Sequence, residues 1–202
     1  KQAADPRAAE EVKSELNEII GLSEVKDYVL SLEQNYIIQR LREARGMKAD
    51  VPTMHMIFTG NPGTGKTTIA RLVSRYLKAM GVLSGGQLIE VTRADLVGKY
   101  VGHTAPLTQQ VIRSALGGVL FIDEAYSLYR GADDSFGLEA IDTIVKGMED
   151  HREDLIVILA GYTKEMEEFL TANSGLRSRF PNIIEFPDYT AEELLAITKL
   201  TA

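Results

Sequence analysis

Apolar residues along the chain fall into two kinds of pattern. The first is a helical spacing, in which Val25, Val29, Leu32 and Tyr36 predict a helix over residues 23–44 with Ser23 as its N-cap. The second is a series of compact apolar runs that are too short for helices. These runs predict five strands, at residues 54–59, 88–92, 119–122, 155–160 and 183–186.

Helical patterns separate the predicted strands, at residues 66–80, 106–116, 138–149 and 164–170. Strict alternation of strand and helix predicts an α/β fold, in which helices cover both faces of a parallel sheet. A capping-box pattern from Thr190 to Glu193 predicts one more helix close to the end of the sequence.

Composition is that of an ordinary globular protein, with 45% hydrophobic and 25% charged residues among 202. No apolar run reaches the roughly 20 residues of a membrane helix, and residues 1–10 are too polar for a signal peptide. We therefore expect a cytoplasmic protein with no membrane partner. Three isolated histidines and no cysteine disfavour disulfides and transition-metal sites. A net charge of −7 without a basic block disfavours a nucleic-acid partner.

A glycine-rich segment directly follows the first predicted strand and precedes a predicted helix. Residues 60–67 match the pattern G-x-x-x-x-G-K-[ST] of phosphate-binding loops. We expect its backbone amides to surround the phosphates of ATP, Lys66 to reach the β- and γ-phosphates, and Thr67 to bind Mg²⁺. The alternative is a turn that binds nothing. The predicted nucleotide-binding residues are Gly60, Asn61, Pro62, Gly63, Thr64, Gly65, Lys66, Thr67 and Thr68.

Two carboxylates, Asp123 and Glu124, end the third predicted strand, at the sheet edge where α/β proteins bind ligands. We expect Asp123 to hold Mg²⁺ through its water shell and Glu124 to orient the water that attacks the γ-phosphate. The alternative is a strand that ends in solvated acids. A small-molecule kinase would gain nothing from a water-activating Glu. A GTPase would carry an Asn-Lys-x-Asp segment, which the sequence lacks, although residues 95–98 match the short D-x-x-G pattern.

Three longer stretches then resemble the AAA+ ATPases. Residues 99–106, 118–126 and 158–162 are similar to the branch that holds the stage V sporulation protein K and the red-type Rubisco activase, and the sporulation type is preferred. The resemblance implies a three-layer αβα P-loop NTPase fold with a five-stranded parallel sheet in the order 5-1-4-3-2. It also implies self-association into a ring, usually a hexamer, with nucleotide at the subunit boundaries.

The resemblance also divides the chain into three parts. Residues 1–20 are expected to form an N-terminal helical extension, residues 21–189 the large P-loop subdomain, and residues 190–202 the start of a helical lid that is otherwise largely absent. Because the lid is truncated, we expect weak hydrolysis and weak ring assembly from this chain alone.

A predicted pore loop is implied by the match of Lys99, Tyr100, Val101 and Gly102 to the aromatic loop with which AAA+ rings grip a substrate chain. An aromatic ring beside an apolar residue can hold almost any polypeptide, and a glycine lets the loop move. The alternative is that the aromatic and apolar side chains pack into the core. An adenine-lining role, or else a helix-capping turn, is implied for Ile20, Gly21 and Leu22.

Two arginines, Arg177 and Arg179, match the arginine-finger position, where one subunit reaches the γ-phosphate bound by its neighbour. Either one can be the finger, and the alternative is a solvated basic loop. The γ-phosphate sensor at the end of the fourth strand is usually Asn or Thr. Here the candidates are Tyr162 and Thr163.

The sequence thus predicts an ATPase that binds ATP and Mg²⁺ and uses hydrolysis to remodel an unidentified client protein. A nucleotide-gated binding module that assembles on ATP without pulling is the main rival, and a P-loop kinase is a third possibility. Neither the client nor the number of subunits follows from the residues.

Overall fold

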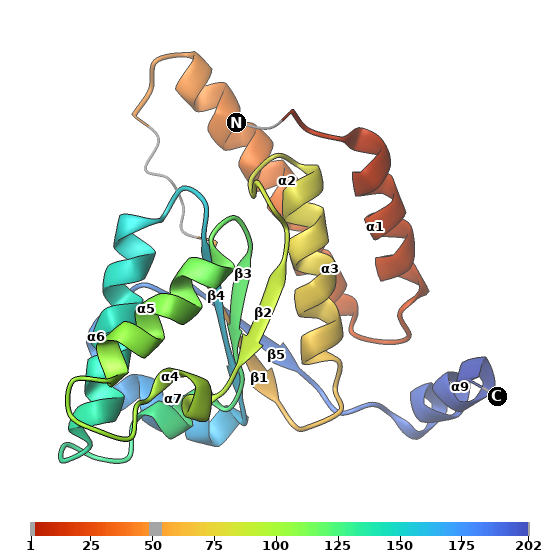
Figure 1. Cartoon of the computed structure of the whole chain (residues 1–202). Helices are drawn as coiled ribbons and strands as arrows, with labels where there is room; N and C mark the ends of the chain where they lie inside the picture. The colour runs from red at the N-terminus through yellow and green to blue at the C-terminus, as the bar shows by residue number, and fades with distance from the viewer. Residues whose placement is uncertain (1–2, 49–53, 202) are drawn as a thin grey trace.

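The computed structural model describes residues 3–48 and 54–201. Five parallel strands form one sheet in the order β2-β3-β4-β1-β5, which confirms the predicted order and the predicted αβα architecture (Figure 1). The strands are β1 (Met56–Gly60), β2 (Leu88–Val91), β3 (Val119–Ile122), β4 (Ile156–Gly161) and β5 (Asn182–Phe186).

Helices connect successive strands and cover the sheet. The longer ones are α1 (Pro6–Glu18), α2 (Ser23–Ala44), α3 (Lys66–Ala79), α5 (Thr104–Ala115), α6 (Ser135–Asp150), α7 (Thr163–Ala172) and α9 (Ala191–Thr201). Three single turns join them: α4 (Arg93–Leu96), the 3₁₀ turn η1 (Ala125–Leu128) and α8 (Ser174–Arg177).

The two faces of the sheet carry separate apolar cores because successive strand residues point to opposite sides. One core includes Phe58 of β1 and packs against α1, α2 and α3. The other includes Ile57, the neighbour of Phe58, and packs against α5, α6 and α7. Figure 1 shows the two helical layers on either side of the sheet.

The α1 helix belongs to the first of these layers. Its Val12 and Leu16 are buried against α3, and Glu15 makes two 2.7 Å hydrogen bonds to Arg75 of that helix. Asp5 caps the helix by accepting hydrogen bonds from the backbone of Arg7 and Ala8. The helix therefore packs on the main body, and the three-part division of the chain remains a prediction.

The predicted elements all occur, with ends that differ by a few residues. Ser23 was expected as an N-cap but is the first residue of α2, and the cap is Leu22 in the left-handed region with a φ of 55°. The capping box of α9 is confirmed, because Thr190 and Glu193 exchange hydrogen bonds of 2.9 and 3.1 Å. The D-x-x-G match has a structural use: Asp95 accepts a hydrogen bond from the Thr92 backbone and caps α4. Residues 1–2, 49–53 and 202 lie outside the described residues, so the first and last residues of the expected N-terminal extension and lid are not described.

Among residues 3–48 and 54–201, no helix is both long and apolar enough to cross a membrane.

Candidate functional site

A cavity of about 550 Å³ opens at the carboxyl edge of the sheet. It lies where β1, β3 and β4 end side by side, because β4 lies between the other two strands. Loops that follow neighbouring parallel strands meet at this edge, which is the usual ligand site of such sheets. The cavity is lined by Gly60, Pro62, Gly63, Gly65, Lys66, Thr67, Thr68, Phe121, Asp123, Glu124, Gly161, Tyr162, Tyr189, Leu194 and Ile197.

The phosphate loop curls around one side of this cavity. Gly60, Gly63 and Gly65 have φ angles of 146°, 73° and 96°, which residues with a Cβ rarely adopt. At Gly60 the space is also closed, because a Cβ there would lie 2.5 Å from the carbonyl oxygen of Phe186. The Thr64 hydroxyl closes the loop by donating a 2.7 Å hydrogen bond to the Asn61 carbonyl. The glycine spacing is thus required by the backbone path.

A second set of contacts ties the loop to the chain that follows β5. The Asn61 amide donates to the carboxylate of Asp188 at 3.0 and 3.2 Å. The Tyr189 hydroxyl donates to the Thr64 carbonyl at 3.3 Å. Asn61 therefore fixes the loop from outside, and its side chain is held away from the cavity lining.

Lys66 is the first residue of α3, at the positive end of the helix dipole. Its Nζ donates hydrogen bonds of 2.7 and 2.8 Å to the carbonyls of Gly60 and Asn61, which holds the ammonium inside the loop. Burial lowers the pKa of the Lys66 ammonium, and the nearby Asp123 carboxylate partly opposes that shift. A cation, a glycine-rich loop and a helix N-terminus together favour a polyphosphate.

The acidic pair faces the phosphate loop across the cavity. Asp123 is held at the end of β3 by a 2.9 Å hydrogen bond from its backbone amide to the Val91 carbonyl. Glu124 is exposed, and its φ of 49° places it in the left-handed region, a strained conformation for a residue with a side chain. Its amide donates to the Asp123 carboxylate at 2.9 Å. Strain of this kind is typical of functional turns.

The donor set fits a magnesium ion. Thr67 and Asp123 both line the cavity, one with a hydroxyl and one with a carboxylate. Mg²⁺ prefers such hard oxygen ligands and takes the rest of its shell from water and phosphate. In the part of the chain that the structure describes, no cluster of three or more His, Cys, Asp or Glu side chains could hold a metal alone. Thr67 and Asp123 would leave the remaining positions of a magnesium shell to phosphate and water oxygens.

The sensor candidates are separated by their positions. Tyr162 follows β4 and lines the cavity, and its ring lies 6.0 Å from that of Tyr126. Thr163 is the first residue of α7 and is not among the lining residues. Of the two, Tyr162 is placed to contact a ligand.

The predicted adenine segment lies behind the phosphate loop. Leu22 is buried, and its Cδ1 lies 3.3 Å from where a Cβ on Gly65 would be. Gly21 lies against the carboxylate of Glu193. Neither these two nor Ile20 are among the lining residues, and an adenine role for the segment stays a prediction. Three further lining residues, which no sequence motif indicated, supply apolar surface from the chain after β5: Tyr189, Leu194 and Ile197.

The predicted pore loop projects from the end of α4 into solvent. Tyr100 is 68% exposed and Val101 is 88% exposed, so the alternative of core packing is wrong. Gly102 has a φ of 83°, and the Tyr100 ring packs edge-on against His103 at 5.6 Å. Lys99 is also exposed. The loop thus presents an aromatic and an apolar side chain that the described residues do not cover.

The two arginines lie at the opposite, amino edge of the sheet. They precede β5, whose first residue pairs with Met56 at the start of β1, whereas the phosphate loop follows the end of β1. Arg179 forms an ion pair with Glu149, and donates a 2.8 Å hydrogen bond to the Gly175 carbonyl. Arg177 donates to the Phe180 carbonyl at 2.7 Å. A strand length of roughly 13 Å or more separates both from the site in their own chain.

Comparisons with known proteins agree with this geometry. Residues 56–188 match the family described as "ATPase family associated with various cellular activities (AAA)". The chain is 50% identical to the stage V sporulation protein K of Bacillus subtilis over 189 residues, which are 94% of this chain and 59% of that protein. It is 51% identical to protein CbbX of Cereibacter sphaeroides over 191 residues, which are 94% of this chain and 62% of that protein.

A chloroplastic ribulose bisphosphate carboxylase/oxygenase activase from Cyanidioschyzon merolae is 50% identical over 193 residues, which are 95% of this chain and 66% of that protein. The chain thus spans about three-fifths of the length of the curated relatives it matches. The AAA domain of FIGL-1, solved with ADP, superposes with a TM-score of 0.63 over 91% of this chain and 59% of that one. At 23% identity it shows the shared fold. The chain belongs to the AAA family of ATPases.

Proposed function

We propose that this protein hydrolyses ATP at the boundaries between subunits of a ring, and uses the energy to remodel a client protein. The observation that carries the proposal is the separation of the arginines from the phosphate loop in one chain. An arginine at the amino edge can serve a γ-phosphate only in a neighbouring subunit, which requires assembly. The uncovered Tyr100 loop supplies the surface that would grip the client.

In the proposed reaction, residues of this chain bind the phosphates and orient the attacking water. The loop amides and Lys66 bind and orient the β- and γ-phosphates, while Glu124 holds a water for attack on the γ-phosphorus. The water oxygen bonds to phosphorus, the bond to the bridging oxygen breaks, and the water proton passes toward Glu124. Mg²⁺, held by Thr67 and by Asp123 through water, would neutralise the charge that develops on the phosphate oxygens. Tyr162 would sense the γ-phosphate, and ADP and phosphate are the products.

Glu124→Gln tests the hydrolytic part. The amide keeps the size of the side chain but cannot accept the proton, so we expect kcat to fall roughly 100- to 10,000-fold with ATP affinity retained. Phosphate release and the binding of a fluorescent ATP analogue are measured in parallel, with Glu153→Gln at an exposed position as the control. Full turnover by the Glu124 variant would contradict the assignment.

Tyr100→Ala tests the remodelling part. We expect basal ATP binding to be retained, because the loop is exposed and lies outside the cavity lining, and client remodelling to be lost. Remodelling that survives the substitution would favour a nucleotide-gated binding module.

The names of the relatives suggest two candidate processes. We propose a sporulation-related remodeller, and the nearly equal identity to the CbbX and activase relatives makes Rubisco activation the second candidate. ATPase activity with and without red-type Rubisco separates the two. Stimulation of the ATPase by Rubisco would make Rubisco activation the preferred candidate, and no stimulation would leave the sporulation-related role preferred.

A further inference from the structure

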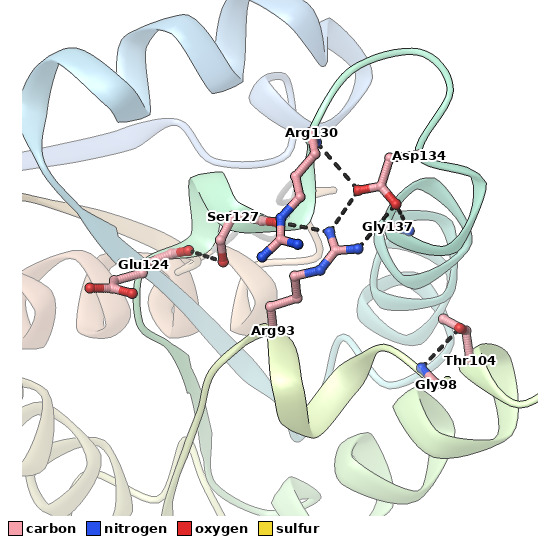
Figure 2. Close-up of polar contacts among 8 residues, drawn as sticks. All are labelled: Arg93, Gly98, Thr104, Glu124, Ser127, Arg130, Asp134 and Gly137. Carbon is pink, nitrogen blue, oxygen red and sulfur yellow. Dashed lines mark hydrogen bonds and ion pairs between the residues drawn. The ribbon is translucent and has the colours of Figure 1, made fainter. Parts of the chain in front are cut away.

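A polar network lies behind Glu124, on the side of the turn that faces away from the cavity. Figure 2 shows the Glu124 carboxylate directed away from this network, which joins η1, α4 and the start of α6. Its central residue is Arg93, the first residue of α4. Arg93 Nη1 donates a 2.8 Å hydrogen bond to the Ser127 carbonyl and lies 2.6 Å from a carboxylate oxygen of Asp134.

The network reaches Glu124 through the backbone of the turn. The Glu124 carbonyl accepts two hydrogen bonds from Ser127, one from the amide at 2.9 Å and one from the hydroxyl at 2.7 Å. The Ser127 carbonyl in turn accepts from Arg93. Since Glu124 is the strained residue that begins this turn, groups that fix Ser127 also fix the direction of the Glu124 side chain.

Asp134 holds the arginine in a planar, two-point contact. Its two carboxylate oxygens lie 2.6 and 3.0 Å from the guanidinium nitrogens, and the two side chains are only 13% and 16% exposed. The same carboxylate caps α6 by accepting from the amide of Gly137 at 3.2 Å, and accepts from the Arg130 amide at 3.3 Å. The beginning of a long helix thus anchors Arg93.

Close packing leaves the pair little freedom. A Cβ at Gly137 would lie 2.0 Å from the Leu128 carbonyl oxygen and 3.0 Å from Arg93 Nη1. The last residue of α4, Leu96, is buried, and its carbonyl accepts a 2.8 Å hydrogen bond from Thr108. A guanidinium fixed at this many points forms a firm support for a neighbouring turn.

We propose that Arg93, held by Asp134, is a positioning residue that keeps the strained turn of Glu124 in the orientation needed for hydrolysis. This inference rests on the proposed role of Glu124 in the attack on ATP. Arg93 touches neither the cavity nor the phosphate loop, so its effect is on the rate of the reaction and not on nucleotide affinity. A displacement of about 1 Å in a catalytic group can lower a rate on the order of 100-fold.

Three variants test the role of Arg93. Arg93→Lys keeps the charge but loses the two-point geometry, Arg93→Ala loses both, and Asp134→Asn keeps an acceptor for the α6 cap while removing the charge. We expect kcat to fall roughly 10- to 100-fold in all three, with the Kd for a fluorescent ATP analogue within about twofold of wild type. Arg113→Lys, at an exposed position on α5, is the control and should match wild type.

A purely structural role gives a different result. If Arg93 only stabilised the fold, the Lys variant would unfold at a lower temperature, and kcat would recover fully once folded protein was quantified by active-site titration. We also expect Arg93→Lys to have no further effect on the residual rate when combined with Glu124→Gln, because the positioned group is then absent. A kcat within twofold of wild type for Arg93→Lys and Arg93→Ala, or a further loss in the combined variant, overturns the proposal.

The same assay separates the two proposals. Glu124→Gln that turns over ATP like wild type overturns the proposed function, and the positioning role with it. Glu124→Gln that is inactive, together with Arg93 variants of normal kcat, overturns the positioning role alone.

Discussion

The two edges of the sheet differ in how much of a site each contains. At the carboxyl edge, one chain brings together the phosphate loop, the acidic pair and Tyr162 around a cavity. At the amino edge, Arg177 and Arg179 contact their own loop and Glu149, and neither lines that cavity. One edge holds a site that folds with the chain. The other carries the arginines that a second subunit would use under the proposed function.

The two edges differ in whether their residues depend on the folding of one chain. Nucleotide binding depends on residues that neighbouring strands bring together, so it follows from folding. The arginines lie on a surface, and their intramolecular contacts are those of partly exposed side chains, with Arg179 35% and Glu149 59% exposed. Exposed ion pairs of this kind contribute little to stability. If Arg179 acts as the proposed finger, exchanging Glu149 for a phosphate would cost the fold little.

Among changes at the amino edge, the largest effect is expected for Arg179→Ala. An arginine finger contributes roughly a thousandfold to kcat, so we expect a loss of about that size with ATP affinity unchanged. Arg177→Ala is the matched comparison and should cost less, because the guanidinium of Arg177 is bonded to its own backbone at Phe180. Steady-state hydrolysis assays measure kcat, and nucleotide-binding assays measure the affinity for ATP.

Mixing experiments show whether the finger acts on a neighbour. When Arg179→Ala protein is mixed with wild type at constant total concentration, activity should fall more steeply than the wild-type fraction. Activity that is linear in that fraction, or constant per subunit over a wide dilution range, would mean that the site is not shared.

A smaller effect, on stability, is expected at the amino edge from His55. Its ring is buried beside Phe180 at 5.8 Å, and its Nδ1 accepts a 3.0 Å hydrogen bond from the Val157 amide. Burial lowers the pKa of His55 from 6.5 to about 4. Protonation therefore favours the unfolded chain, and stability that is complete above pH 6.5 is lost as the pH falls toward 4. The loss amounts to about 3 kcal/mol.

His55→Asn isolates this contribution. The amide oxygen of Asn retains the acceptor but does not titrate, so the variant should lose the slope of unfolding free energy between pH 6.5 and 4, even if its absolute stability is lower. His151→Asn, at an exposed position, is the control and should keep the wild-type slope. An unchanged slope in the His55 variant would show that other groups cause the acid sensitivity. Denaturant unfolding at several pH values measures both.

The sequence predicted the carboxyl edge better than the rest for a physical reason. The phosphate loop and the acidic pair are contiguous motifs at strand ends, and the strand order places them together. Each motif could therefore be assigned to the carboxyl edge of the sheet from its position after a strand. The pair Arg93 and Asp134 is 41 residues apart and has no local signature. Tyr189, Leu194 and Ile197 reach the cavity only through the path of the chain after β5, which periodicity does not describe.

Element ends were predicted less well than element types. The turns α4, η1 and α8 are four residues each, which is too short for an apolar period to show. The left-handed cap at Leu22 was missed because Ser23 has the composition of a cap and Leu22 does not. For the short turns and for the cap of α2, local sequence preference did not determine the structure.

The most direct test of the account is the affinity of the protein for ATP in magnesium buffer, compared with that of Lys66→Ala. Removing the ammonium from the loop should weaken binding roughly 10- to 100-fold, while Lys146→Ala, an exposed lysine on α6, should bind like wild type. Isothermal titration gives all three values. A wild-type protein that binds no nucleotide, or a Lys66 variant that binds as tightly as wild type, would contradict the claim that this loop holds the triphosphate.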